Sequence, residues 1–336
     1  MSTHRERLLK AFNFDNPDKL PLIYQRSSGG LYVHGQKLLD LFNKYPSDNL
    51  IIFDKIPQSS PEDFDIGGNY HKFVTDDWGT EWEYCLLGLQ GHPHKYPLKN
   101  WDNLHDYKFP MPLPPDNNYI EKHKEEFMIE APIFISIFEK LHALRPFEDV
   151  LMGLCTFDDN IIELCDRLIQ WYRNAIQTYL EAGCDIFKFG DDWGTQNSLF
   201  FPPDFFRKFF KPRLAELMKP IRDSGRLIMY HSCGAIEPLF DDLVEVGING
   251  LWHQISLYEP EKFAKKAAAS KILLYLHMDR QKLIPYGSPA QIKETVRRYA
   301  RIHKKLGGGA AFYVEIENDA PFKNVKALIE SIHEYR

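Results

Sequence analysis

The sequence predicts a single α/β domain of the (β/α)8 (TIM) barrel class, and three observations support this prediction. From about residue 180 onward, short apolar runs alternate with longer amphipathic segments, which is typical of parallel βαβ units. Several of these runs are continuously hydrophobic, as expected of strands that are covered on both faces. The chain has 336 residues, within the range of one large barrel, and no linker-like segment interrupts it, so we expect one domain over residues 1–336.

The second half of the chain supplies five predicted strands, each followed by a predicted helix. Gly225, Gly247 and Gly307 follow three of these helices directly, as glycine often does at helix ends. We expect strands over residues 185–189, 227–231, 248–253, 271–276 and 310–314, and helices over residues 203–224, 236–246, 260–270, 289–306 and 321–335.

The first half is less regular. Residues 61–116 are rich in proline, glycine, aspartate and aromatic residues, and we interpret them as an inserted hairpin region and a long loop after the second strand. Together with the second half, the remaining segments complete the eight strand–helix units. We expect an N-terminal helix over residues 5–14, strands over residues 21–24, 50–53 and 133–138, and a long helix over residues 160–181.

Composition excludes several classes of protein. The formal charge of −6 and the scattered basic residues do not favour a nucleic-acid partner, which would need clustered lysine and arginine. No apolar stretch approaches the roughly 20 residues that cross a bilayer, so no membrane association is expected. The five cysteines form no CxxC pair, and residues 1–6 do not resemble a signal peptide, which together predict a reduced, cytoplasmic protein.

His231 and Cys233 are the strongest candidates for metal ligands. They stand two residues apart where a predicted strand ends, and barrel active sites lie at the carboxyl ends of the strands. Imidazole and thiolate are preferred ligands of zinc, and this spacing can direct both toward one point. A third ligand would come from another strand end. The alternative is a core histidine beside a buried cysteine.

Other polar and aromatic residues near predicted strand ends have two interpretations each. Asp191 and Asp192 could cap the next helix through backbone N–H groups, or one of them could bind a cation or a substrate group in a catalytic role, with Asp279 as a further catalytic candidate. Arg26 could clamp a carboxylate or phosphate, or be an ordinary surface residue. Glu315 and Glu317 alternate on a strand end and therefore share a face. We interpret His92 and His94, in the insertion, as a loop feature rather than as a second metal site. The candidate substrate-binding residues are Arg26, Trp78, Trp193, Gln196, His253 and Gln254.

These motifs resemble the uroporphyrinogen decarboxylase superfamily over essentially the whole chain. The resemblance implies a (β/α)8 barrel with a cleft at the carboxyl ends of its strands. It rests on residues 5–11 (RERLLKA), 18–21 (DKLP), 190–196 (GDDWGTQ) with Pro203 and 209–212 (FFKP), 231–234 (HSCG), Asp279 with 283–285 (LIP), and 320–325 (APFKNV).

The sequence departs from the decarboxylases of that superfamily at two motifs. Their arginine loop has the form RQAGR, whereas residues 26–30 here are RSSGG, so that only the first arginine, Arg26, is present. Their last strand-end motif, GHGI, carries a histidine at a position that corresponds to Val314, counting back from Pro321. A decarboxylase of some other carboxylated substrate is therefore the second hypothesis, and a binding or sensor barrel without turnover is the third.

The resemblance is closer to the corrinoid methyltransferase branch, in which a His-x-Cys pair holds zinc. His231 and Cys233 match that pair. Coenzyme M-type members have a cysteine as the third ligand where this chain has Val314, so Glu315 or Glu317 is the expected substitute. The resemblance thus implies a zinc enzyme that moves a methyl group between a small molecule, a methyl ether or thiol, and a corrinoid carried by a separate protein. It also allows a homodimer.

Overall fold

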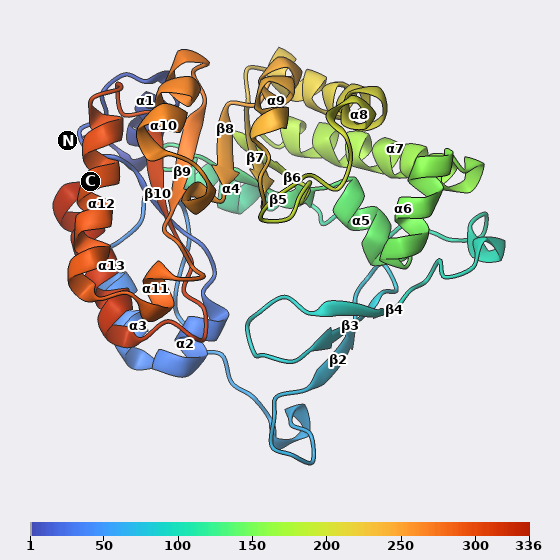
Figure 1. Cartoon of the computed structure of the whole chain (residues 1–336), viewed down its shortest axis with the longest axis horizontal. Coiled ribbons are helices and arrows are strands. Elements are labelled where there is room, and N and C mark those ends of the chain that lie inside the picture. Colours follow the sequence, from blue (N-terminus) through green and yellow to red (C-terminus); the bar gives the residue numbers. More distant parts are fainter. Residues whose placement is uncertain (1) are drawn as a thin grey trace.

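The computed structural model describes residues 2–336 and shows an α/β fold around a curled, seven-stranded parallel sheet (Figure 1). The strands follow the order β1-β10-β9-β8-β7-β6-β5, and every neighbouring pair is parallel. This arrangement is consistent with a TIM-like barrel. The strands are β1 Leu22–Tyr24, β5 Glu130–Ile135, β6 Ile186–Gly190, β7 Leu227–Ser232, β8 Gly250–His253, β9 Leu273–His277 and β10 Ala310–Val314.

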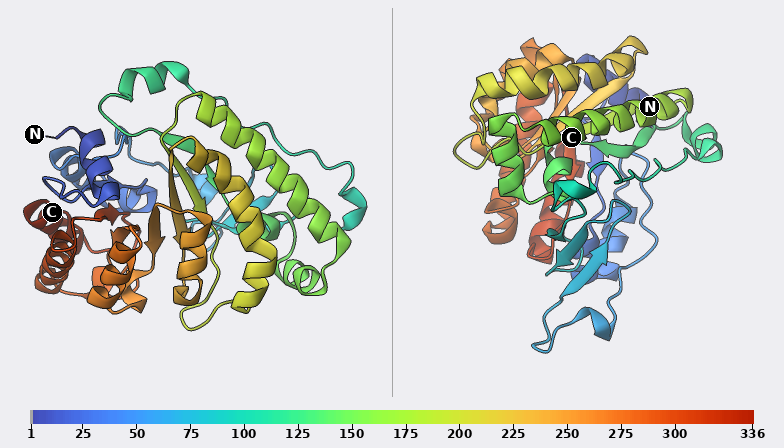
Figure 2. Two further views of the ribbon diagram at one scale, coloured as in Figure 1. Left: turned by 90° about the horizontal axis from the view of Figure 1, so that it is seen from above. Right: turned by 90° about the vertical axis from the view of Figure 1, so that its right-hand side faces the viewer.

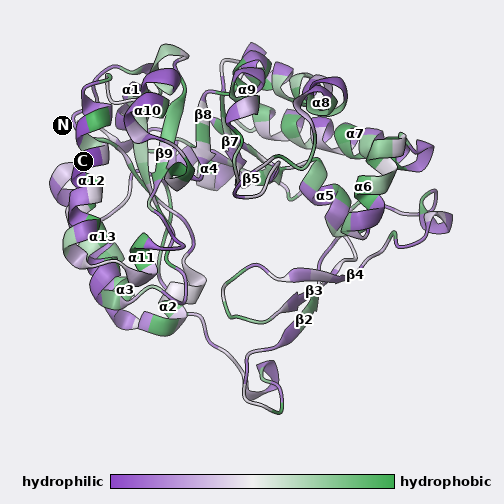
Figure 3. Ribbon diagram, in the orientation of Figure 1, coloured by the Kyte–Doolittle hydropathy of each residue, from purple (hydrophilic) through white to green (hydrophobic). Residues whose placement is uncertain are grey.

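Helices pack around the outer face of this sheet (Figure 2), and most show a hydrophobic and a hydrophilic side (Figure 3). The longest, α7, begins where the Asp158 carboxylate accepts the backbone N–H groups of Asn160 and Ile161. The helices are α1 His4–Asn13, α2 Ser28–His34, α3 Gln36–Lys44, α4 Asn117–His123, α5 Phe138–Leu144, α6 Phe147–Thr156, α7 Asp159–Glu181, α8 Pro203–Asp223, α9 Phe240–Val246, α10 Pro260–Ala269, α11 Leu283–Tyr286, α12 Pro289–Lys304 and α13 Phe322–Tyr335.

The five strand–helix units predicted for the second half of the chain are all present. Their boundaries differ from the prediction by a few residues, and β8 starts at Gly250 rather than at Ile248. The helix predicted over residues 236–246 begins as a 3-10 turn, Glu237–Leu239, before α9. Pro238 lies in this turn, where its missing N–H costs no intrahelical hydrogen bond.

The strand predicted over residues 50–53 does not form, and the sheet is open between β1 and β5. Side chains that precede this segment occupy the free edge of β1. The Asp48 carboxylate accepts the Leu22 N–H at 2.8 Å, and the Asn49 amide bonds both the N–H and the carbonyl of Tyr24 at 2.9 Å. Because these backbone groups are already satisfied, little remains for a neighbouring strand to pair with.

A small antiparallel sheet lies within residues 61–116 and projects away from the parallel sheet (Figure 2). It consists of β2 Lys72–Thr75, β3 Glu81–Tyr84 and β4 His92–Lys95. Its residues are mainly hydrophilic (Figure 3), and no residue of these three strands is fully buried.

None of the helices in residues 2–336 combines the length and apolar character that a membrane span requires.

Candidate active site

The concave face of the curled sheet changes from hydrophobic to polar at the carboxyl ends of its strands. Side chains alternate between the two faces of a strand, so residues two apart share a face. Met229, Tyr275 and Tyr313 belong to a small hydrophobic cluster that is separate from the larger core between sheet and helices. Two residues further along each strand, the same face carries polar side chains. These polar side chains are His231, His277 and Glu315. Trp252 of β8 completes the layer, which we call the polar layer.

His231, Cys233 and Asp192 converge in this layer. Their donor atoms all lie within 4.8 Å of one another. The His231 Nε2 atom is 3.6 Å from the Cys233 Sγ and 3.5 Å from an Asp192 carboxylate oxygen, and that carboxylate also accepts the backbone N–H of Cys233 at 2.7 Å. Nitrogen, sulfur and oxygen donors at such separations fit a zinc ion with an open position. Asp192, which we predicted to be catalytic, is thus the third donor of the group.

The tautomer of His231 also suits metal binding. Its Nδ1 lies 3.0 Å from the carbonyl oxygen of Trp252, and because a carbonyl only accepts, Nδ1 carries the proton. The Nε2 lone pair therefore points toward Cys233 and Asp192. Burial lowers the pKa of His231, and burial together with the Asp192 charge raises the pKa of the Cys233 thiol to about 12. A thiol in these surroundings needs a cation nearby to become a thiolate.

Trp252 also fixes the tautomer of a second histidine. Its indole N–H donates to His277 Nδ1 at 3.2 Å, so His277 carries its proton on Nε2. That Nε2 is buried and has no hydrogen-bond partner within residues 2–336. Burial, with the nearby Arg280 charge, holds the pKa of His277 well below its usual value, so the ring is neutral. Through these two hydrogen bonds, Trp252 leaves His231 with a free lone pair on Nε2 and His277 with an N–H on Nε2.

We expect Trp252→Phe to release His277 while leaving His231 in place. The phenylalanine keeps an aromatic ring and the backbone carbonyl but removes the indole donor. Nitrogen-15 NMR of labelled histidines should show a single Nε2–H tautomer for His277 in the wild type and a mixture in the variant. An unchanged His277 spectrum in Trp252→Phe would contradict the assigned hydrogen bond.

A cavity of about 270 Å³ lies beside this layer, and Arg280 contributes its main positive charge. The Arg280 guanidinium lies 2.5 Å from Glu317 and 3.8 Å from Glu315. Burial raises the pKa of Glu315 to about 7, against the effect of Arg280. Both glutamates therefore face Arg280 rather than the His231–Cys233 pair, and either would have to leave Arg280 to bind a metal there. Sequence analysis did not identify Arg280 as a site residue.

Comparison with known proteins identifies the family. The family model described as "Uroporphyrinogen decarboxylase (URO-D)" matches residues 142–335, more than half of the chain. The chain belongs to the uroporphyrinogen decarboxylase family. A search of curated proteins gave no match.

One solved structure shows the same fold over the whole chain. A methyltransferase from Methanosarcina mazei aligns with a TM-score of 0.62 at 17% identity, covering 100% of this chain and 99% of the other. A dihydropteroate synthase from Thermus thermophilus aligns over only 48% of this chain and 63% of its own, with a TM-score of 0.35 and 14% identity. The likeness to the first protein establishes that this family member shares its fold.

Three residues predicted to be catalytic or substrate-binding make hydrogen bonds that stabilise the fold of this family member. Asp191 is buried and accepts the N–H groups of Ile137 and Glu139 at 3.0 and 2.8 Å, so it caps α5, an earlier helix, rather than the next helix that the capping interpretation proposed. Trp193 is buried in the core, where its indole donates to Tyr230. Asp279 accepts two backbone N–H groups of the turn that follows it.

Of the remaining predicted substrate-binding residues, His253 and Gln254 line the cavity of about 270 Å³. Gln196 donates to Gln254 at 3.0 Å, and the Gln254 oxygen also accepts the N–H of Gly234, beside Cys233. The ring of His253 packs against Tyr258 and Phe263, and burial lowers its pKa to about 3. Two further residues lie outside this cavity: Trp78 packs on Trp171, and Arg26 is exposed beside the opening between β1 and β5.

The position expected to carry the family's third ligand, Val314, does not reach the site. It is 1% exposed and belongs to the core between sheet and helices, because its neighbour Glu315 is the residue that faces inward. The alternation of side chains along a strand could have predicted this from the sequence. His231 and Glu315 each stand two positions after an inward-facing strand residue and therefore face inward as well.

Proposed function

We propose that this family member is a zinc-dependent methyltransferase that moves a methyl group between a small molecule, of the methyl ether or thiol type, and a corrinoid carried by a partner protein. The convergence of His231, Cys233 and Asp192 beside a cavity carries the proposal. Zinc bound there would supply Lewis acidity, keeping an acceptor thiol ionised or polarising an ether oxygen. The similar structure from Methanosarcina mazei is a methyltransferase, which supports the same reaction class.

The surrounding residues would position the metal ligands and the substrate. The Trp252 carbonyl holds the His231 ring in the ligating tautomer, a type of contact that typically changes metal affinity by about 10–100-fold when lost. His277 also lines the cavity, but its Nε2–H is buried, so it would donate to a substrate oxygen only after the ring turns toward the cavity. The cavity of about 270 Å³ suits a small methyl donor or acceptor.

A metal-independent decarboxylase of a carboxylated substrate is the second candidate, and a different cavity favours it. A cavity of about 860 Å³ lies at the opening between β1 and β5, and Arg26 and Lys188 line it. Lys188 is paired with Glu130 at 2.6 Å, which leaves Arg26 and Lys55 as the positive groups available to a carboxylate. This reaction would not depend on Cys233.

Substitution of Cys233 by serine tests the proposal. Serine keeps the size of the side chain but is a poor zinc ligand, so we expect Cys233→Ser to bind one zinc ion fewer per chain than the wild type and to lose turnover by at least about 100-fold. Zinc is measured by elemental analysis of the purified protein.

Cys155→Ser is the matched control, because Cys155 is exposed on α6 and lies outside the group of His231, Cys233 and Asp192. It should match the wild type in zinc content and turnover. Unchanged zinc and turnover in Cys233→Ser would remove the basis of the methyltransferase proposal and favour the decarboxylase.

A further inference from the structure

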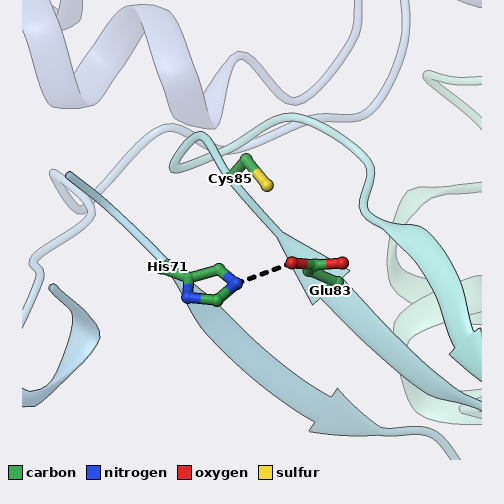
Figure 4. Close-up of side chains that lie close together, drawn as sticks. All are labelled: His71, Glu83 and Cys85. Atoms are coloured by element: carbon green, nitrogen blue, oxygen red, sulfur yellow. Dashed lines mark hydrogen bonds and ion pairs between the residues drawn. The ribbon is translucent and has the colours of Figure 1, made fainter. Parts of the chain in front are cut away.

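A second group of potential metal ligands lies at the small antiparallel sheet and shares no residue with the candidate active site; Figure 4 shows its side chains. Lys72 of β2 pairs with Tyr84 of β3, so the adjacent positions, His71 and Cys85, lie opposite each other. Glu83 is two residues before Cys85 and therefore shares its face. The antiparallel register thus brings an imidazole, a thiol and a carboxylate together.

The three side chains are close enough to share one ion. His71 Nε2 lies 2.7 Å from a Glu83 carboxylate oxygen, and the donor atoms of His71, Glu83 and Cys85 all lie within 4.8 Å of one another. Figure 4 shows His71 and Glu83 joined through their ends, with Cys85 beside them. The other Glu83 oxygen lies 3.7 Å from Nδ1 of His94, on β4. His94 lies outside the group of three donors, so its side chain would have to turn toward them to become a fourth ligand.

We propose that His71, Glu83 and Cys85 form a second zinc site, with His94 as the fourth ligand. A partly exposed His–Glu pair contributes little stability by itself and gives no role to the thiol. One dication would balance the charges of the Glu83 carboxylate and a Cys85 thiolate, and mixed nitrogen, sulfur and oxygen donors are those that zinc accepts. Four protein ligands would make this a structural site.

The position of Cys85 gives such a site a structural consequence. The loop after Cys85 packs against the barrel: the Asn318 amide, which follows β10, donates to the Leu87 carbonyl at 3.0 Å. The next residue, Gly88, approaches Gly29 so closely that an added Cβ would lie 2.1 Å from the Gly29 nitrogen. Zinc at Cys85 would therefore fix the small sheet to the loop that contacts α2 and the end of β10.

The experiment compares zinc binding by the full chain in the wild type, Cys85→Ser, Cys233→Ser and the double variant, each stripped with a chelator and then dialysed against zinc. We expect about two zinc ions per chain in the wild type, about one in each single variant and none in the double variant. Equal zinc content in the wild type and Cys85→Ser overturns this site. Zinc retained by Cys233→Ser but lost from Cys85→Ser contradicts the proposed function and supports this site.

Alkylation of cysteines gives a second measurement that does not depend on zinc counting. Zinc should slow the modification of Cys85 by iodoacetamide by at least about 10-fold, because a ligated thiolate is a poor nucleophile. Cys155, which is also exposed, serves as the control within the same molecule. The same protection should disappear in His71→Ala. Equal alkylation of Cys85 with and without zinc overturns the proposal.

Discussion

Replacing Asp192 with asparagine is expected to lower zinc affinity at the His231–Cys233 group by about 10–100-fold or more. Asparagine keeps the oxygen that accepts the Cys233 N–H at 2.7 Å, so the loop conformation should persist. The substitution removes the negative charge and the carboxylate donor. We therefore expect it to weaken zinc binding without unfolding the loop. Competition with a chromophoric chelator measures the affinity.

The control for this variant is Asp241→Asn, on the exposed surface of α9, where the carboxylate pairs with Lys266 at 3.4 Å. It should bind zinc as the wild type does. Equal zinc affinity in Asp192→Asn and Asp241→Asn would contradict the assignment of Asp192 as the third donor. It would then favour Glu315 or Glu317, the ligands predicted from the sequence.

The second large effect concerns stability: Asp48→Asn is expected to lower the free energy of unfolding by about 3–5 kcal/mol at neutral pH. The Asp48 side chain has no solvent exposure and lies 2.6 Å from both Arg7 and Arg336. It also contacts His4 at 2.9 Å and accepts the Leu22 N–H. Asparagine would leave the buried Arg336 guanidinium without its counter-charge and the Arg7 guanidinium with Asp18 alone. Urea unfolding measures the change.

The effect should depend on pH in a defined direction. Burial alone would raise the pKa of Asp48, but the His4 hydrogen bond, Arg336, the Leu22 N–H and Arg7 lower it to about 2. A folded-state pKa below the unfolded value of about 3.9 contributes stability above that value, and the contribution is lost as the pH falls from about 4 to about 2.

The difference between the wild type and Asp48→Asn should therefore shrink over that acidic interval. Asp204→Asn is the control, because the Asp204 side chain is 93% exposed and its pair with Arg207 should contribute less than about 1 kcal/mol. A difference that does not change with pH would show that the Asp48 charge is not what stabilises the fold.

The sequence predicted the second half of the fold well and one element of the first half wrongly. Apolar runs and helix-end signals identify parallel strands and their helices because both depend on local residues. The failed strand over residues 50–53 has an apolar pattern, but the side chains of Asp48 and Asn49 occupy the edge of β1 that it would pair with. Such competition between side chains and backbone depends on tertiary placement.

The candidate site was predictable where it depends on one strand and less so where it depends on several. His231 and Cys233 were identified because their spacing and strand-end position are local features. Their third neighbour, Asp192, comes from the adjacent strand end, and the glutamates expected there face Arg280 instead. The role of Trp252, which bonds one histidine through its carbonyl and another through its indole, involves contacts between strands that spacing does not reveal.

The central claim is that the chain transfers methyl groups with the help of zinc at His231 and Cys233. The most direct measurement follows the absorbance of reduced free cobalamin, a substitute for the partner's corrinoid, during incubation with small methyl ethers and thioethers. We expect methylated cobalamin with zinc-loaded wild type, loss of the product after chelation, recovery on adding zinc, and no product with Cys233→Ser. Methyl transfer that is as fast in the zinc-free protein and in Cys233→Ser as in the zinc-loaded wild type would contradict the proposed role of zinc.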